Sequence, residues 1–177
     1  MGLTARDVMS TDVTTIREDE SVEELIHLFR VSHFTGVPVV NAAGKAVGVV
    51  SETDILRALA YTISPPTSGE QPTAEEQRKQ GRDKSATSRL LRPKELRTPK
   101  RIHEVTEALL RRKVHDLMTP VVVSCPADAP LADVCETMAW KHVHRVVVLD
   151  EQGRVVGLIS ALDAVQRFGE ELRSQEA

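Results

Sequence analysis

The sequence contains an internal repeat, in which a shift of 109 residues superposes the first part of the chain on the last, and this repeat limits the folds that the chain can adopt. Residues 48–54 read GVVSETD and residues 157–163 read GLISALD, so Asp54 and Asp163 stand 109 residues apart. The same shift, applied without a gap, superposes further identical residues: Asp7 on Asp116, Met9 on Met118, Val13 on Val122, Asp19 on Asp128, His33 on His142, Val37 on Val146, Val39 on Val148, Gly44 on Gly153, Val47 on Val156, Gly48 on Gly157 and Ser51 on Ser160. Identities that agree on one offset indicate the duplication of one structural unit.

The apolar pattern predicts the same order of elements in each copy: a short helical turn followed by strand, helix, strand, strand and helix. Short apolar runs bounded by turn residues predict the extended segments. They are expected at residues 13–16, 37–40 and 46–50 in the first copy and at 121–125, 146–149 and 155–159 in the second. Because strands this apolar are buried on both faces, the predicted fold class is α/β (α+β), with two β-α-β-β-α units.

The first helix of each copy carries its own start signal. Ser21 and Glu24 have the spacing of a capping box. In the second copy Asp128 is expected to cap the helix, with Pro130 in its first turn. One face of each helix is apolar, and its residues are Val22, Leu25, Ile26 and Phe29 in one copy and Leu131, Val134, Cys135 and Met138 in the other.

The ends of these helices and the turns that follow also match between the copies. His33 and His142 are expected to finish the helices, because a partial positive charge suits a helix C-terminus. The turns between the two later strands read NAAGK and DEQGR. The glycine of each turn is expected to take a positive φ.

The serine and aspartate of the repeated heptapeptide have two compatible interpretations. They stand where a strand passes into a helix, and the ligands of α/β sheets favour such strand ends. A serine at a helix N-terminus suits an anion, and a carboxylate three residues later can accept hydrogen bonds from two vicinal hydroxyls, as on ribose. Alternatively, Ser51 with Asp54 and Ser160 with Asp163 form only the caps of their helices.

The residues before the second-copy strand carry charge that the first copy lacks. His144 and Arg145 precede Val146, whereas the matching positions of the first copy are Thr35 and Gly36. The forked donors of arginine fit phosphate, so this pair is a candidate phosphate contact. A solvated strand entry is the alternative.

Taken together, these motifs resemble a tandem pair of CBS domains, named for cystathionine β-synthase and called a Bateman module. The resemblance covers about residues 3–60 and 113–170. It rests on the segments DVMSTDVTTI, DLMTPVVVSC, TGVPVVNAAGKAVGVVSETDI and VHRVVVLDEQGRVVGLISALDAV. It implies an intramolecular pseudo-twofold pair with two related clefts that bind AMP, ADP, ATP, S-adenosylmethionine or a dinucleotide.

The resemblance also assigns roles to residues. Asp54 or Asp163 would hold the ribose with Ser51 or Ser160 nearby, and His144-Arg145 is similar to a phosphate-contacting pair in the gamma subunit of AMP-activated kinase. The base would be clasped by apolar and backbone groups, with flanking strand residues beside them: Val13, Thr14, Thr35, Gly36, Val37, Val49, Val122, Val123 and Leu158. The chain departs from the family in having Glu52 and Ala161 where a basic residue often follows the serine, and Val147 where proline is frequent.

The resemblance divides the chain into a first CBS domain at 1–61, a linker at 62–112, a second CBS domain at 113–170 and a tail at 171–177. The linker is rich in Pro, Ser and charge, which predicts a loop or disorder. A helix is expected near 99–113, with Ile102, Val105 and Leu109 on one face, and Leu90, Leu91 and Leu96 are expected to form a short docking piece.

The linker is also basic. Residues 64–113 contain 13 Lys and Arg against 7 Asp and Glu, while the whole chain has a net charge of −3. A solvated tether is the favoured interpretation. A lid that reaches anionic ligands and a surface for nucleic-acid phosphates are the alternatives. Nucleic acid is disfavoured, since the chain is acidic overall and the segment has no aromatic residue to stack on bases.

No pattern in the chain predicts an enzyme, a cofactor or a metal site. His142 and His144 lack further ligands. Cys125 is interpreted as packing at a strand end, and Trp140 as the cover of a domain edge or an interface. Two cysteines form no disulfide framework, no apolar run approaches the ~20 residues of a membrane span, and the start has no apolar signal segment. A cytoplasmic location is expected.

Three functions therefore compete. The first is a non-enzymatic sensor of an adenosine-containing ligand that acts by conformational change on an unidentified effector protein. The second is a structural dimerisation module with degenerate clefts, and a homodimer is implied by the resemblance in either case. The third is a nucleic-acid-associated protein that uses the basic linker.

Overall fold

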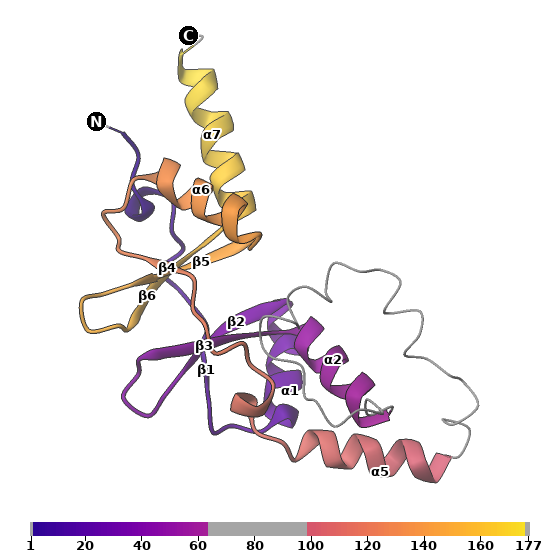
Figure 1. Cartoon of the computed structure of the whole chain (residues 1–177). Coiled ribbons are helices and arrows are strands. Elements are labelled where there is room, and N and C mark those ends of the chain that lie inside the picture. Colours follow the sequence, from indigo (N-terminus) through magenta and orange to yellow (C-terminus); the bar gives the residue numbers. More distant parts are fainter. Residues whose placement is uncertain (1, 64–98, 176–177) are drawn as a thin grey trace. The chain divides into compact units, whose positions relative to one another are not determined.

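The computed structural model describes residues 2–63 and 99–175, and in it the two repeats fold in the same order (Figure 1). The first repeat forms the 3₁₀ turn η1 (Ala5–Asp7), β1 (Ile16–Arg17), α1 (Val22–Ser32), β2 (Gly36–Val40), β3 (Ala46–Ser51) and α2 (Glu52–Ile63). The second forms η2 (Val114–Asp116), β4 (Ser124–Cys125), α6 (Leu131–Lys141), β5 (Arg145–Leu149), β6 (Val155–Ser160) and α7 (Ala161–Gln175). This order confirms the predicted fold class.

Each repeat contributes one three-stranded sheet, in the order β1-β2-β3 and β4-β5-β6. β1 pairs parallel with β2, and β4 pairs parallel with β5. β5 runs antiparallel to β6, which places Arg145 opposite Ser160. The first strands are shorter than the extended segments expected from the sequence, because only two residues of each join the ladder.

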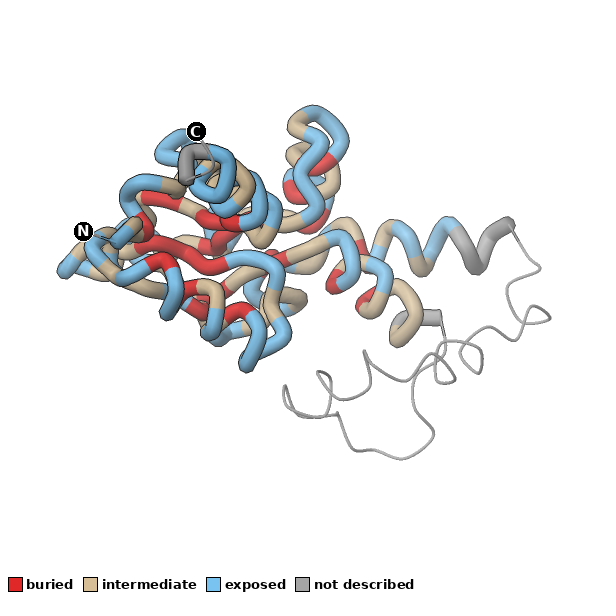
Figure 2. The backbone as a smooth tube through the Cα atoms, turned by 90° about the horizontal axis from the view of Figure 1, so that it is seen from above, coloured by how far each residue is buried: buried red, intermediate tan, exposed pale blue. Residues whose placement is uncertain are grey.

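Burial follows the predicted apolar pattern (Figure 2). Val37 and Val39 in β2, and Val146 and Val148 in β5, are buried, as expected for central strands. The predicted helix faces point inward, and their buried residues are Val22, Leu25 and Phe29 in α1 and Leu131, Val134 and Met138 in α6. Cys125 packs at the end of β4 against the core of the second repeat, which confirms its interpretation.

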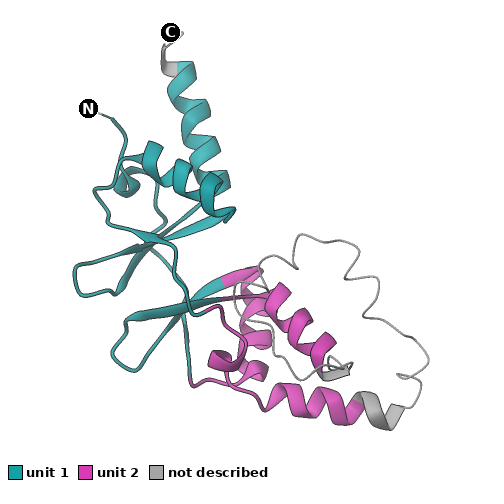
Figure 3. Cartoon of the chain, in the orientation of Figure 1, with its two compact units in different colours: residues 1–18, 37–49, 120–177 teal, residues 19–36, 50–119 magenta. Residues whose placement is uncertain are grey.

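The chain divides into two compact units whose bounds cut across the repeats (Figure 3). One unit contains residues 1–18, 37–49 and 120–177, and the other contains residues 19–36 and 50–119. The first unit therefore includes the leading segment of the first repeat and most of its β2 and β3, together with most of the second repeat. The second unit includes the helices of the first repeat together with the leading segment of the second.

Backbone hydrogen bonds within each unit explain this exchange. In the first unit, the Ala5 N–H donates to the Ala129 carbonyl at 2.8 Å, and the Leu131 N–H donates to the Leu3 carbonyl at 2.9 Å. The second unit repeats the arrangement at the shifted positions. There the Val114 N–H donates to the Glu20 carbonyl and the Val22 N–H to the Arg112 carbonyl, both at 2.9 Å. Each leading segment thus satisfies a free N–H at the start of the other repeat's first helix.

This exchange corrects the predicted start of α6. The N-cap position is occupied by Pro130, whose side chain makes no capping hydrogen bond, and the helix begins at Leu131. The prediction that Asp128 caps the helix is wrong, because the carbonyl of Leu3 takes the N–H at the helix start. In α1 the predicted capping box is present, with the Glu24 N–H donating to Ser21 Oγ at 3.2 Å.

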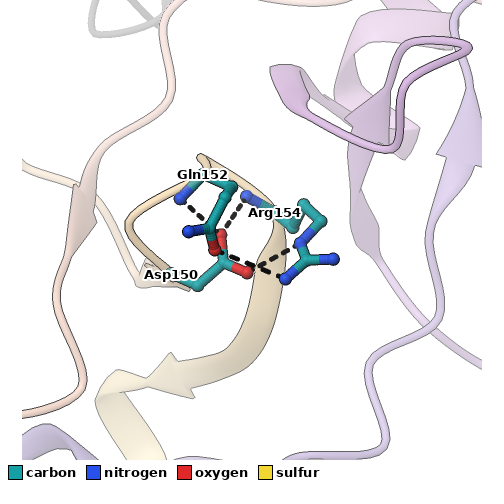
Figure 4. A network of polar contacts seen from close by, with 3 residues as sticks. All are labelled: Asp150, Gln152 and Arg154. Carbon is teal, nitrogen blue, oxygen red and sulfur yellow. Dashed lines mark hydrogen bonds and ion pairs between the residues drawn. The ribbon is translucent and has the colours of Figure 1, made fainter.

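The predicted helix ends and turns are confirmed. His33 and His142 are the C-caps of α1 and α6 in the left-handed conformation, with φ values of 56° and 52°. Gly44 and Gly153 take positive φ in the two turns. In the second turn Asp150 accepts backbone hydrogen bonds that close the loop (Figure 4).

Helix α5 (Pro99–Leu110) lies in the linker and packs on the first repeat. Leu109, only 4% exposed, joins a core cluster with Val22 of α1 and Ala58 of α2. The docking piece expected at Leu90, Leu91 and Leu96 and the side chain of Ile102 lie outside the described residues. Among the helices of the described ranges, none combines the length and apolar character needed to cross a membrane.

Candidate ligand site at the starts of α2 and α7

The structure places the aspartate of GVVSETD at the start of α2, where its carboxylate is almost fully partnered. The backbone N–H of Ser51 donates to Asp54 Oδ2 at 2.8 Å, and the Ser51 hydroxyl donates to the same oxygen at 2.6 Å. Arg57 Nη1 donates to Asp54 Oδ1 at 2.9 Å. Asp54 is 8% exposed, whereas Ser51 and Arg57 are half-buried, so a buried carboxylate is held by partners that reach the surface.

The aspartate of GLISALD has a simpler environment at the start of α7. The backbone N–H of Ser160 donates to Asp163 Oδ2 at 2.7 Å, and the Asp163 N–H donates to Ser160 Oγ at 3.2 Å. These reciprocal bonds form a capping box with aspartate in place of glutamate. Across the described parts of the chain, no hydrogen bond or ion pair reaches Asp163 Oδ1. The side chain is half-buried.

The capping interpretation of the heptapeptide is fully met in the second repeat, whereas in the first repeat the described bonds show Asp54 accepting from Ser51 but none from the Asp54 N–H to Ser51 Oγ. A carboxylate held by the first turn of its own helix also has a fixed orientation. The other carboxylate oxygen, Oδ1, is available to groups outside the cap. In the first repeat it accepts a hydrogen bond from Arg57, and in the second repeat it has no partner among the described residues.

The residues that precede each central strand lie beside these helix starts. In the second unit the Glu52 N–H donates to the Thr35 carbonyl at 3.2 Å, and in the first unit the Ala161 N–H donates to the His144 carbonyl at 2.9 Å. Thr35, His144 and Arg145 are exposed. Each repeat thus brings its predicted strand-entry residues to the beginning of the helix that carries its aspartate.

The remaining candidate residues differ in how much surface they offer. Val37 and Val123 are buried at 5% and 9% exposure and belong to the core, and Val123 accepts the Val147 N–H at 3.0 Å. The others are half-buried: Val13, Thr14, Gly36, Val49, Val122 and Leu158. Leu158 also exchanges backbone hydrogen bonds with Ser10 at 3.0 Å in both directions.

Sequence reasoning missed Arg57. The pair could have been predicted from the sequence, because residues three apart are neighbours on one face of a helix and Arg57 follows Asp54 by three positions. The matching position in the second repeat is Gln166, which donates to Glu170 Oε1 at 3.3 Å instead. Trp140 is 86% exposed, so within the described residues it covers no domain edge, and its role at an interface stays a prediction.

No other cluster in the described ranges suggests a different chemistry. Within residues 2–63 and 99–175, no three His, Cys, Asp or Glu side chains are arranged to hold a metal ion. Burial raises the pKa of the Cys125 and Cys135 thiols, which disfavours a nucleophilic thiolate.

Comparisons with known proteins agree with this architecture. The chain is 27% identical over 172 residues to a protein of Methanocaldococcus jannaschii named MJ1426, covering 91% of this chain and 88% of that protein. It spans less than half the length of the next three curated relatives that it matches.

Solved structures share the fold. The CBS domain pair of MJ0100, in complex with 5′-methylthioadenosine and S-adenosylmethionine, matches with a TM-score of 0.64 at 19% identity over 97% of this chain and 99% of that one. CBSX2 from Arabidopsis thaliana matches with a TM-score of 0.67 at 20% identity over 98% and 99%. A second structure of CBSX2, in complex with AMP, matches with a TM-score of 0.64 at 19% identity over 96% and 98%.

The family assignment follows from the sequence itself. The family model described as the CBS domain matches twice, at residues 5–61 and 114–170. These two matches contain both heptapeptides, both capped aspartates and both three-stranded sheets. The chain belongs to the CBS domain family and carries two CBS domains in tandem.

Proposed function

We propose that the chain is a non-enzymatic regulatory module that binds an adenosine-containing ligand, with AMP, ADP or ATP favoured over S-adenosylmethionine and NAD. Binding would engage the starts of α2 and α7 and change the conformation that the module presents to an effector protein. A ligand shifts such an equilibrium only if it binds one conformation more tightly than another.

One observation carries the proposal. Asp163 is fixed by its capping bonds to Ser160, and its Oδ1 atom has no partner among the described residues. A carboxylate that is half-buried and already oriented loses little freedom when it accepts hydrogen bonds from a ribose. This arrangement supports the proposal that Asp163 accepts hydrogen bonds from a pair of vicinal hydroxyls.

The neighbourhood of Asp163 also suits a phosphate. Arg145 begins β5 directly opposite Ser160, and the carbonyl of the adjacent His144 holds the first N–H of α7. An arginine at this register position and the N-terminus of α7 are two features that attract anions. The first repeat has Thr35 and Gly36 at these positions and offers no such cation.

The related structures lend support of a general kind. The domain pair of MJ0100 binds two adenosine derivatives and CBSX2 binds AMP. Both share the fold of this chain at about one-fifth identity, so the class of ligand, rather than its identity, is what they suggest.

Calorimetric titration of the full chain with AMP, ADP, ATP, S-adenosylmethionine and NAD tests the proposal. The Asp163→Asn variant keeps one oxygen for the Ser160 N–H, replaces the other oxygen with an NH2 group and removes the negative charge. We expect at least one nucleotide to bind the wild type at micromolar concentrations and to bind this variant at least tenfold more weakly.

The matched control is Asp133→Asn, which removes an exposed carboxylate from the first turn of α6 and should leave the affinity unchanged. Protein that is folded by circular dichroism, is free of carried-over nucleotide and binds none of the five ligands would reject the proposal.

Self-association is a second candidate function, supported by the surface of α7. Four large apolar side chains of this helix are exposed at intervals of three or four residues, which places them on one face: Leu162 at 79%, Val165 at 68%, Phe168 at 58% and Leu172 at 55%. In the first repeat α2 is packed against α5. We propose that a second copy of the chain covers the exposed face of α7.

Sedimentation velocity distinguishes a dimer from a monomer. The wild type should sediment as a dimer and Val165→Glu as a monomer, because a charge in an apolar interface is costly to desolvate. Val31→Glu makes the same change at a 61% exposed position on α1 and should leave the dimer intact. A wild type that sediments as a monomer at all concentrations tested would reject self-association.

A further inference from the structure

The two repeats differ at the position that faces the second oxygen of their aspartates. Arg57 lies three residues after Asp54, and Gln166 lies three residues after Asp163. The Arg57 guanidinium reaches Asp54 Oδ1 at 2.9 Å. Gln166 turns to Glu170 instead, so the repeats share the cap but not the partner of Oδ1.

The Arg57–Asp54 pair is more protected than an ordinary surface ion pair. The side chain of Asp54 is 9% exposed and that of Arg57 is 30% exposed. Exposed pairs contribute little because water and salt screen them, whereas a pair with a buried carboxylate is screened less. Ser51 donates two hydrogen bonds to the other oxygen, so both oxygens of the Asp54 carboxylate already have partners.

A ribose that approaches Asp54 therefore meets an occupied acceptor. To accept two hydroxyls, the carboxylate must give up the guanidinium on Oδ1 or share that oxygen with it. The apparent affinity of a site falls by the fraction of molecules in which it is open. Asp163 carries no such cost, because Oδ1 has no described partner to displace.

We propose that Arg57 is an internal competitor that occupies the Asp54 site, so that the adenosine ligand binds first through Asp163. This inference rests on the proposed function and goes further by ranking the two sites and by naming the residue that ranks them. Arg57 acts as a positioning residue, and the first site opens only when its guanidinium leaves Asp54 Oδ1.

The test isolates the Asp54 site by working in the Asp163→Ala background. Calorimetric titrations with AMP and with adenosine compare Asp163→Ala alone with Asp163→Ala combined with Arg57→Gln. Glutamine is the residue that the second repeat has at this position. We expect the added Arg57→Gln change to raise the affinity for both ligands at least tenfold.

The direction of this effect separates the inference from simple electrostatics. Removal of a cation weakens the binding of an anion, so a gain in AMP affinity requires the release of an acceptor. The control combines Asp163→Ala with Arg111→Gln, which removes an 81% exposed arginine from a surface ion pair. It should show no gain in affinity for AMP or adenosine.

The reciprocal variant moves the competitor to the second repeat. In the Asp54→Ala background, Gln166→Arg places an arginine three residues after Asp163. Glu170→Gln is added because Glu170 otherwise attracts residue 166. We expect AMP and adenosine to bind this variant at least tenfold more weakly than the protein with Asp54→Ala and Glu170→Gln alone.

The outcomes distinguish this inference from the proposed function. Wild type that binds through Asp163, with no gain or a loss from Arg57→Gln, would overturn the inference and leave the proposed function standing. Asp163→Ala protein that binds as tightly as the wild type would overturn the ranking of the sites. If neither the wild type nor any variant binds adenosine or AMP, both proposals fall together.

Discussion

The Sδ atom of Met9 lies 2.5 Å from the point where a β-carbon on Gly157 would stand. Met9 precedes Ser10, whose backbone pairs with Leu158 in β6. The leading segment of the first repeat therefore runs directly against β6. A side chain at this position would displace Met9, so the close approach favours glycine at the start of GLISALD and ties the heptapeptide to the exchange of leading segments.

Gly157→Ala should lower the free energy of unfolding by about 1–3 kcal/mol, because the new methyl group would also lie 3.0 Å from Met9 Cβ and Cγ and overpacking of a core costs this much. Urea denaturation measures the change. Gly169→Ala is the matched control, since a β-carbon at Gly169 would meet nothing within 4 Å.

In the control, replacement of a helical glycine should stabilise the protein by about 0.5–1 kcal/mol. Met9→Ala should reduce the cost of Gly157→Ala in a double-mutant cycle. Equal effects of Gly157→Ala with and without Met9 would show that the contact does not require the glycine.

The exchange of segments marks the limit of what the sequence can predict. The offset of 109 residues predicts which segments are equivalent, and the positions of α1, α6, β2, β5, β3 and β6 follow from it. The same offset is compatible with a leading turn that packs on its own repeat or on the other one. The backbone bonds of Ala5 with Ala129 and of Val114 with Glu20 decide this, and no side-chain pattern encodes them.

The candidate site shows the same division. The capping bonds of Asp54 and Asp163 follow from local spacing, and the heptapeptides predict them. The partner of Asp54 Oδ1 depends on which of several nearby groups the Arg57 side chain selects. Likewise Asp128 is a residue type that commonly caps helices, but at the start of α6 the backbone carbonyl of Leu3 accepts the hydrogen bond instead.

His33→Gly and His142→Gly should each stabilise the protein by about 0.5–1 kcal/mol. Both histidines have positive φ, at 56° and 52°. A side chain in the left-handed region costs roughly 1–2 kcal/mol, and part of the gain is lost to the greater freedom of glycine in the unfolded chain. Thermal and urea denaturation measure the effect.

His27→Gly provides the control, because His27 is exposed in the interior of the same helix as the His33 cap. There glycine should destabilise by about 0.3–0.5 kcal/mol, the difference between the helix propensities of histidine and glycine. If His33→Gly destabilises to the same extent as His27→Gly, the histidine makes contacts at the cap that outweigh the strain of its backbone.

Leu109→Ala should lower the free energy of unfolding by about 2–4 kcal/mol, since removal of a buried leucine leaves a cavity. The side chain is 4% exposed between Val22 and Ala58. Leu56→Ala makes the same chemical change on α2 at a 65% exposed position and should fall within about 0.5 kcal/mol of the wild type. Similar losses in the two variants would show that α5 is only a tether.

Asp150 should make stability depend on pH in the acid range. Hydrogen bonds from the Arg154 backbone and side chain and the Arg154 charge, together with a bond from the Gln152 N–H, hold the pKa of Asp150 below the usual value of an aspartate (Figure 4). A lowered pKa in the folded state contributes stability that is complete above the unfolded pKa and is lost as the pH falls through the folded pKa. The wild type should therefore lose this contribution below about pH 4.

Asp150→Asn removes the ionisable group but keeps the Oδ1 acceptor, as Asn41 does when it accepts the Ala43 and Lys45 N–H groups in the first repeat. The stability difference between wild type and Asp150→Asn, measured by urea denaturation from pH 2.5 to 7, should be constant near neutrality and shrink below about pH 4. Glu151→Gln removes the same charge from the same turn and serves as the control. A difference between wild type and Asp150→Asn that stays constant down to pH 2.5 would mean that the Asp150 network does not favour the ionised carboxylate.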